Sequence, residues 1–230
     1  MKKTEKVPAT SQKTKLRRIA ALGMLTALSF AAVLLGKLVP PIMPSAPFLS
    51  YEPKDVIITV GGMLFGPLEA FGVTLAVSII EMVTVSGTGP VGMLMNLISS
   101  CAFACTASVI YKKNRRLSGA VLGLISGVAV MSVVMVLWNY LITPLYMGVE
   151  RSVIKPMLLP VFLPFNLIKG SANAGLTMLL YKPIVTALRA SHFAKEKESP
   201  KGKINPFVAV TALFVIAACV LTVLALNGLI

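Results

Sequence analysis

Long apolar stretches dominate this sequence and restrict what it can fold into. About 20 residues of α-helix cross the hydrocarbon core of a membrane. None of the stretches alternates polar and apolar residues as a lipid-facing β-strand would. The sequence therefore predicts an all-α integral membrane protein, in which the second stretch is short enough to need cover from its neighbours. The predicted spans are residues 19–38, 55–66, 67–86, 90–111, 118–143, 159–181 and 206–228.

The formal net charge of +14 is distributed by position along the chain. Basic residues gather at 2–18, 112–116 and 182–203, which all fall on one side of the seven predicted spans. The positive-inside rule therefore predicts a cytoplasmic N-terminus and an outer C-terminus. Nucleic-acid binding would need a soluble basic fold with stacking aromatics, which the sequence does not offer. The other side carries a mixed set: Lys37, Glu52, Lys54, Asp55, Glu150, Arg151 and Lys155.

One predicted span contains a polar stripe. Asn166, Lys169 and Asn173 are three and four residues apart, so they share one face of a helix. A lysine near the bilayer centre costs about 2.5 to 3.5 kcal/mol on insertion scales, so it requires a partner. Two interpretations are open: a structural ion pair, with Glu81 as the obvious counter-ion, or a face that binds a ligand. Asn96 and Asn139 add amides within two other spans.

The segment 39–53 contains five prolines and cannot be a continuous helix. Phe48, Leu49 and Tyr51 are apolar for an exposed loop. The sequence therefore predicts an ordered outer loop, which either folds back over a cavity as a lid or lies on the membrane interface.

A strip of small residues runs along the first span at Gly23, Ala27 and Ala31. Such a strip lets another helix approach closely. It indicates either packing within the protein or docking to a partner membrane subunit.

No constellation of residues indicates catalysis. The chain shows no Ser–His–Asp set, paired carboxylates or phosphate-binding loop, so we expect no enzyme and no catalytic residues. Cys101 and Cys105 lack accompanying ligands, which argues against a metal site, and nothing predicts a disulfide for Cys219.

Over residues 15–190 the chain resembles the substrate-binding (S) component of an energy-coupling-factor (ECF) vitamin transporter, of the riboflavin-specific type. The resemblance rests on four segments: Phe48-Leu49-Ser50-Tyr51, Thr88-Gly89-Pro90-Val91-Gly92 followed by Asn96, Asn139-Tyr140-Leu141-Ile142-Thr143-Pro144-Leu145-Tyr146, and Pro164-Phe165-Asn166-Leu167-Ile168-Lys169-Gly170.

The resemblance implies a six-helix bundle that binds riboflavin near the outer face, under the loop after the first helix. The vitamin would be transported cargo, so no cofactor is expected. Partners would be a transmembrane scaffold subunit, docked on the small-residue strip, and two ATPase subunits. An asparagine amide both donates and accepts hydrogen bonds and an ammonium donates, which suits the imide edge of a flavin. The resulting candidates are Asn96, Asn139, Asn166 and Lys169 for polar contacts and Phe48, Leu49 and Tyr51 for apolar cover.

Two alternatives stay open: an S component for another vitamin, such as thiamine or a pyridoxine-like compound, and a membrane subunit without a transport role. The last apolar stretch departs from the six-helix pattern. The expected organisation is a cytoplasmic basic tail (1–18), the substrate-binding membrane domain (19–188), a basic cytoplasmic linker (189–205) and an extra transmembrane helix (206–228), which the sequence predicts to be dispensable for binding.

Overall fold

The computed structural model describes residues 9–39, 41–43, 46–190 and 206–228, and the regular elements in this part of the chain are all helices. Residues 1–8 of the expected tail (1–18) and residues 191–205 of the expected linker (189–205) lie outside the described residues, whereas residues 9–18 belong to the first helix. The elements are α1 (Ala9–Gly36), α2 (Lys54–Phe65), α3 (Pro67–Thr84), α4 (Gly89–Lys113), α5 (Leu117–Leu141), α6 (Thr143–Met147), α7 (Arg151–Ile154), η1 (Lys155–Met157), η2 (Leu158–Phe162), α8 (Leu163–Ala190) and α9 (Pro206–Leu226).

Six helical segments in the described chain are long and apolar enough to cross a membrane, and the all-α membrane fold is confirmed. Of the seven spans predicted from the sequence, the short α2 is the one not among them, and most of its residues are buried between α1, α3, α4 and α8. The spans are Lys15–Gly36, Pro67–Thr84, Gly89–Lys113, Leu117–Leu141, Arg151–Leu188 and Val208–Leu226.

Glycines bring the inner helices close together. A Cβ at Gly61 would lie 2.8 Å from a methyl group of Leu25 on α1, so a side chain at this position would displace Leu25. On α5, a Cβ at Gly123 or Gly127 would lie 2.8 Å from the carbonyl oxygen of Ala107 or Phe103 on α4. The small residues within these apolar stretches therefore build the packed interior of the bundle.

The turn between α2 and α3 also depends on glycine. Gly66 has φ 128°, a conformation that side chains rarely adopt, and its amide donates to the carbonyl of Gly62. Pro67 then begins α3. α2 and α3 thereby form a hairpin whose open end faces the segment between α1 and α2.

The start of α8 is irregular. The predicted span 159–181 begins as a wide π-helical turn, Leu158–Phe162, which contains Pro160, and continues as a regular helix to Ala190. Pro160 lacks an amide hydrogen and cannot donate an α-helical hydrogen bond, which favours the wider turn. The turn buries Phe162 against the loop that follows α1.

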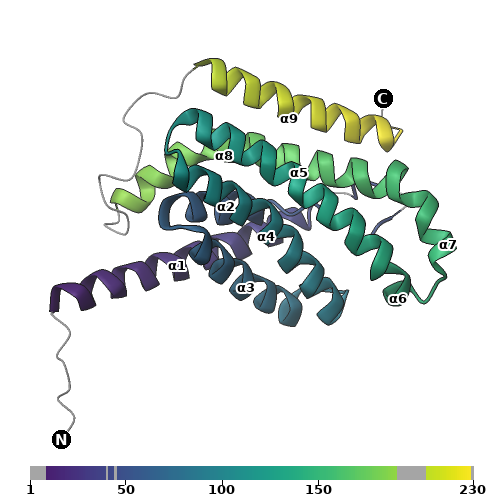
Figure 1. Ribbon diagram of the computed structural model, residues 1–230, viewed down its shortest axis with the longest axis horizontal. Coiled ribbons are helices and arrows are strands. Elements are labelled where there is room, and N and C mark those ends of the chain that lie inside the picture. Colours follow the sequence, from purple (N-terminus) through teal and green to yellow (C-terminus); the bar gives the residue numbers. More distant parts are fainter. Residues whose placement is uncertain (1–8, 40, 44–45, 191–205, 229–230) are drawn as a thin grey trace, which may run out of the picture.

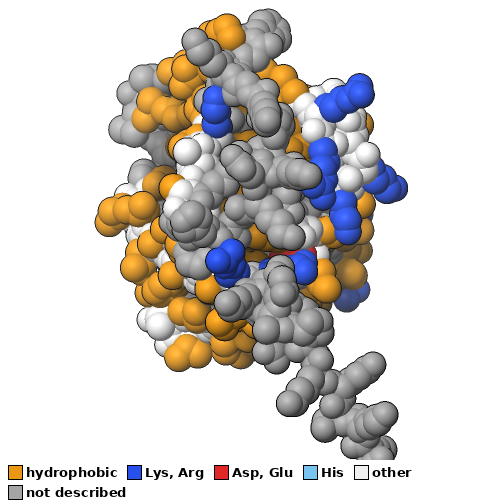
Figure 2. All heavy atoms as spheres, turned by 90° about the vertical axis from the view of Figure 1, so that its left-hand side faces the viewer, with side chains coloured by type: hydrophobic (Ala, Val, Ile, Leu, Met, Phe, Trp, Pro, Cys, Tyr) orange, Lys and Arg blue, Asp and Glu red, His pale blue; other side chains and the backbone are white. Residues whose placement is uncertain are grey.

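The helices are arranged as a bundle with α1 and α9 on opposite sides (Figure 1). α9 lies along α8, and α1 packs on α2 and α3. The end of the bundle seen in Figure 2 carries several exposed basic side chains. Lys112, Lys113, Arg115 and Arg116 at the turn between α4 and α5 are all exposed, as expected for residues outside the hydrocarbon core.

Candidate functional site

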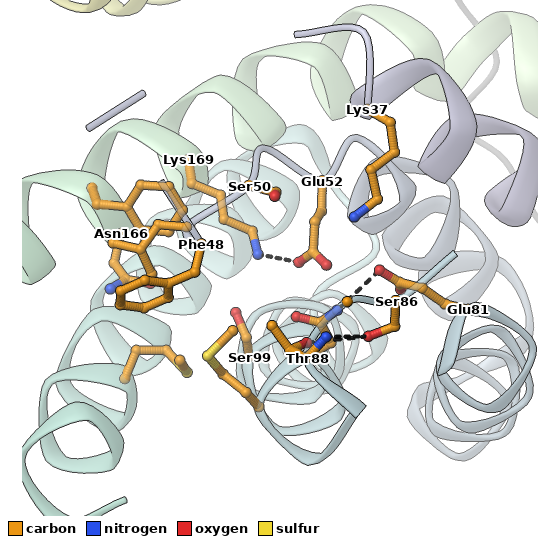
Figure 3. A pocket seen from close by; sticks show the side chains of 16 residues that line it. Lys37, Phe48, Ser50, Glu52, Glu81, Ser86, Thr88, Ser99, Asn166 and Lys169 are labelled. Atoms are coloured by element: carbon orange, nitrogen blue, oxygen red, sulfur yellow. Dashed lines mark hydrogen bonds and ion pairs between the residues drawn. The ribbon is translucent and has the colours of Figure 1, made fainter. Parts of the chain in front are cut away.

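A cavity of about 210 Å³ lies among the loop after α1, the turn between α3 and α4, and helices α3, α4, α5 and α8 (Figure 3). Its lining combines charged groups, amides and hydroxyls with phenylalanine and methionine side chains. The residues are Lys37, Phe48, Leu49, Ser50, Glu52, Glu81, Ser86, Gly87, Thr88, Met95, Asn96, Ser99, Met135, Phe165, Asn166 and Lys169.

Five of the seven predicted binding residues line this cavity. They come from three separate parts of the chain: Phe48 and Leu49 from the loop, Asn96 from α4, and Asn166 and Lys169 from α8. The loop folds back over the bundle, as the lid interpretation expects, and we call its described part, residues 46–53, the lid segment. Leu49 is 2% exposed and belongs to an apolar cluster with Phe162 and Phe165.

Asn139 lies away from the cavity lining. Its Nδ2 donates to the carbonyl of Met135 at 2.7 Å, and its Oδ1 accepts from Thr143 Oγ1 at 2.8 Å. The amide is therefore occupied in joining the end of α5 to the start of α6. Position on a span alone could not distinguish this capping role from a ligand contact.

Tyr51 also points away from the cavity lining. Its hydroxyl donates to Asn173 Oδ1 at 2.9 Å, and Asn173 Nδ2 donates to the carbonyl of Glu52 at 3.1 Å. Burial raises the pKa of Tyr51 above its ordinary value, and Asp55 and Cys219 add to this electrostatically. Tyr51 and Asn173 thus fasten the lid segment to α8.

The predicted pairing of Lys169 with Glu81 is wrong. Lys169 forms an ion pair with Glu52 of the lid segment and lies 3.9 Å from Asp55 Oδ2. Glu81 instead accepts hydrogen bonds from Lys54 at 2.5 Å and from Asn96 Nδ2 at 3.1 Å. Lys54, the residue that directly follows the lid segment, is the cation paired with Glu81, a pairing that sequence reasoning did not consider.

Glu52, Lys54 and Asp55, which the sequence alone places among the charges of the outer side, lie in the interior of the protein. Lys54 and Asp55 are fully buried, and Glu52 is 6% exposed. Lys54 Nζ donates to Glu52 Oε1 at 2.9 Å, so Glu52 bridges two ammonium groups. The sequence does contain a signal for this burial. Glu52, Lys54 and Asp55 place three charges within four residues at the start of a short and otherwise mostly apolar helix, which offers them no exposed face.

The two ammonium groups control the ionisation of Glu52. Burial by itself raises the pKa of this carboxyl, but Lys169 and Lys54 outweigh burial and lower the pKa from 4.5 to about 2. Glu52 is therefore ionised at neutral pH, and its charge ties the lid segment to the floor of the cavity.

The site thus defines a class of protein: a helical membrane protein with a cavity lined by both polar and apolar side chains, which lies beneath the lid segment. Asn166 donates its Nδ2 to the carbonyl of Phe162 at 2.7 Å. Among the described residues its Oδ1 makes no hydrogen bond, so this acceptor is available to a ligand.

Comparison with known proteins identifies the family. Residues 17–181 match the model of the ECF transporter substrate-specific component, and the chain belongs to this family. The match ends within α8, so α9 lies beyond it. Because these proteins are components of transporters, the expectation that the chain is not an enzyme is confirmed.

Several curated relatives are similar over most of the chain. The riboflavin transporter RibU of Staphylococcus aureus is 28% identical over 179 residues, covering 75% of this chain and 93% of the relative. RibU of Streptococcus thermophilus is 29% identical, covering 76% and 86%. The riboflavin transporter FmnP of Bacillus subtilis is 26% identical, covering 77% and 98%.

A solved structure shares the fold. The S component of a bacterial ECF transporter matches with a TM-score of 0.64 and 27% identity, and the match covers 76% of this chain and 99% of that one. The S-component fold expected from the sequence is therefore confirmed.

Proposed function

We propose that this protein captures riboflavin in the cavity beneath the lid segment and serves as the S component of an ATP-driven uptake transporter. The observation that carries the proposal is the cavity itself, which Lys169, Asn166 and Asn96 line together with Phe48. The names of the relatives, which are riboflavin transporters, supply the identity of the ligand.

Lys169 and Asn166 suit the polar edge of a flavin. The imide edge presents carbonyl and ring-nitrogen acceptors around one N–H donor, so an ammonium and an amide oxygen complement it. Lys169 is held by Glu52. A ligand carbonyl would share this ammonium with Glu52, and the bound vitamin would then be linked to the lid segment through the same two side chains.

A smaller apolar hollow of about 10 Å³ adjoins the cavity, and its side chains would have to move apart to admit the other end of a flavin ring. Phe48, Thr88 and Met95 line both spaces, and Trp138 and Tyr146 add aromatic surface to the smaller one. Thr143, which Asn139 holds in place, lines the hollow too. Asn139 therefore supports the binding site indirectly, through Thr143.

The direction of uptake follows from charge. The positive-inside rule favours a cytoplasmic N-terminus, because the basic clusters lie at the N-terminal end of α1 and at the turn between α4 and α5. The lid segment then belongs to the outer side, and we propose that riboflavin enters from there.

The small-residue strip of α1 suits docking to a transmembrane scaffold subunit, which two ATPase subunits would drive. Gly23, Ala27 and Ala31 are exposed, and a Cβ at Gly23 would have no neighbour within 4 Å. Within the described chain this strip is therefore not used for packing, and a partner helix could approach it closely.

A fluorescence titration tests riboflavin binding. Trp138 is the only tryptophan in the sequence and lines the apolar hollow, so bound flavin should quench its emission. We expect the purified protein to carry yellow flavin absorbance, or to be quenched at stoichiometric riboflavin. Quenching by thiamine or pyridoxine, with none by riboflavin, would instead assign the protein to another vitamin.

A further inference from the structure

The helix α9 lies outside the family match and yet contacts the part of the protein that closes the site. Ala212, Ile216, Cys219 and Val223 follow one another at intervals of four, three and four residues, so they form one face of the helix. These four residues are buried or partly buried, whereas Val210, Leu213, Phe214, Val220 and Leu221 are all more than half exposed. We call the first set the inner face of α9.

The inner face fits closely against α8. Gly175 of α8 faces Ile216, and a Cβ at Gly175 would lie 3.0 Å from Ile216 Cγ1 and 3.2 Å from the carbonyl oxygen of Ala212. About two turns before Gly175 is Ile168, whose carbonyl accepts from Cys219 Sγ at 3.8 Å. Contacts of this kind, between a glycine and a branched side chain, hold helices together in a membrane by close packing.

The same face reaches the lid. Val223 packs against the apolar cluster of the lid segment and α8, which includes Leu49 and Phe165. Both of these residues line the binding cavity. Cys219 acts electrostatically on Tyr51, the lid residue that is hydrogen-bonded to Asn173. The C-terminal half of α9 thus lies against the residues that hold the lid segment in place, namely the apolar cluster and Tyr51.

We infer that α9 braces the lid segment in its closed position and so slows the escape of the bound vitamin. This inference rests on the proposed function, since it concerns the release of riboflavin. Opening the lid segment requires Leu49 to leave the cluster that Val223 covers, so removal of the Val223 methyl groups lowers the cost of opening. The sequence alone predicts α9 to be dispensable for binding, because the helix offers few polar groups; its effect on the lid would instead come from packing.

The test compares two valine substitutions on the same helix. Val223→Ala removes the contact with the cluster, whereas Val220→Ala removes the same atoms from a position that is 51% exposed. We expect riboflavin to dissociate about threefold to tenfold faster from Val223→Ala, the range for losing part of a packed side chain, and at the wild-type rate from Val220→Ala. Ile216→Ala, which loosens the contact with Gly175, provides a second variant on the inner face.

A measurement without ligand separates this inference from the proposed function. In the lid segment the amide of Leu49 donates to the carbonyl of Ala46 at 3.0 Å, and hydrogen exchange reports its opening. Exchange in residues 46–53 should be faster in Val223→Ala and Ile216→Ala than in Val220→Ala and the wild type. If the wild type bound no riboflavin, the proposed function would fail while this comparison still tested the brace. Equal exchange in all four proteins, or equal acceleration by Val223→Ala and Val220→Ala, would overturn the inference.

Discussion

Replacement of Lys169 by methionine tests the charge cluster and the binding site together. On insertion scales, loss of a lysine from the membrane interior gains about 2.5 to 3.5 kcal/mol, so the sequence alone predicts that stability holds or rises. The structure reverses this expectation. Lys169, on α8, pairs with Glu52 and lies 3.9 Å from Asp55 Oδ2. Its removal leaves Lys54 as the ammonium for the carboxylates of Glu52, Asp55 and Glu81.

The size of the loss can be worked from Glu52. Lys169 and Lys54 together lower the pKa of Glu52 from 4.5 to about 2, which corresponds to roughly 3 kcal/mol of preference for the ionised carboxylate at 1.36 kcal/mol per unit, and Lys169 is the larger of the two causes. Breaking a buried ion pair by removing one partner costs about 3 to 5 kcal/mol, which agrees in magnitude. We therefore expect Lys169→Met to unfold about 6 to 12 °C below the wild type at pH 7.5, at about 2 to 4 °C per kcal/mol for a chain of this size.

The pH dependence identifies the cause. In the wild type the folded pKa of Glu52 is depressed, so its contribution is present above pH 4.5 and is lost as the pH falls towards 2. Without Lys169, burial favours the protonated form of the Glu52 carboxyl. The difference in melting temperature between the wild type and Lys169→Met should therefore become smaller as the pH falls from 7.5 to 5. The double variant Lys169→Met with Glu52→Gln removes the stranded charge, and its melting temperature should recover and lose this dependence on pH.

The assay is thermal unfolding of the purified protein in detergent, followed by riboflavin titration of the variant that stays folded. Lys113→Met serves as the control, because Lys113 is an exposed lysine at the end of α4. Loss of one charge-assisted hydrogen bond should weaken riboflavin binding by about 10-fold to 100-fold, from about 1.5 to 3 kcal/mol. A Lys169→Met variant as stable as the wild type at pH 7.5 would refute the ion-pair argument, and unchanged affinity would remove Lys169 from the binding site.

Three further predictions use other parts of the chain. Ala27→Leu, alone or with Gly23→Leu, should leave riboflavin titration unchanged and abolish uptake by whole cells, because bulk on the exposed strip blocks a partner helix; uptake that survives both changes would exclude this strip from docking. Asn166→Ala should weaken riboflavin binding about 10-fold or more by removing a polar group from the cavity, whereas Asn139→Ala should chiefly lower the melting temperature. A larger loss of affinity in Asn139→Ala than in Asn166→Ala would show that Asn139 contacts the ligand. If α9 crosses the membrane outward, a cysteine added after Ile230 should react with an impermeant thiol reagent in intact cells. A cysteine that reacts only after the cells are lysed would place the C-terminus in the cytoplasm.

The sequence by itself determined the class of the fold and much of the site. Long apolar stretches can satisfy their backbone hydrogen bonds in a membrane only as helices, so the number and place of the spans follow from composition along the chain. The cost of an intramembrane lysine marked Lys169, and its helical neighbour Asn166, as residues with a special role. The prolines of segment 39–53 excluded a helix there and left a loop able to cover the bundle.

The tertiary structure decided which polar groups serve each other. In sequence Glu81 is the obvious counter-ion for Lys169, and only the fold brings Glu52 to Lys169 and Lys54 to Glu81. The two asparagines Asn139 and Asn166 look alike within their spans, yet one joins α5 to α6 and the other lines the cavity. Hydropathy and helical periodicity give the face and depth of a residue within its own helix, whereas pairing depends on how helices rotate and approach, which is set by packing across the whole bundle.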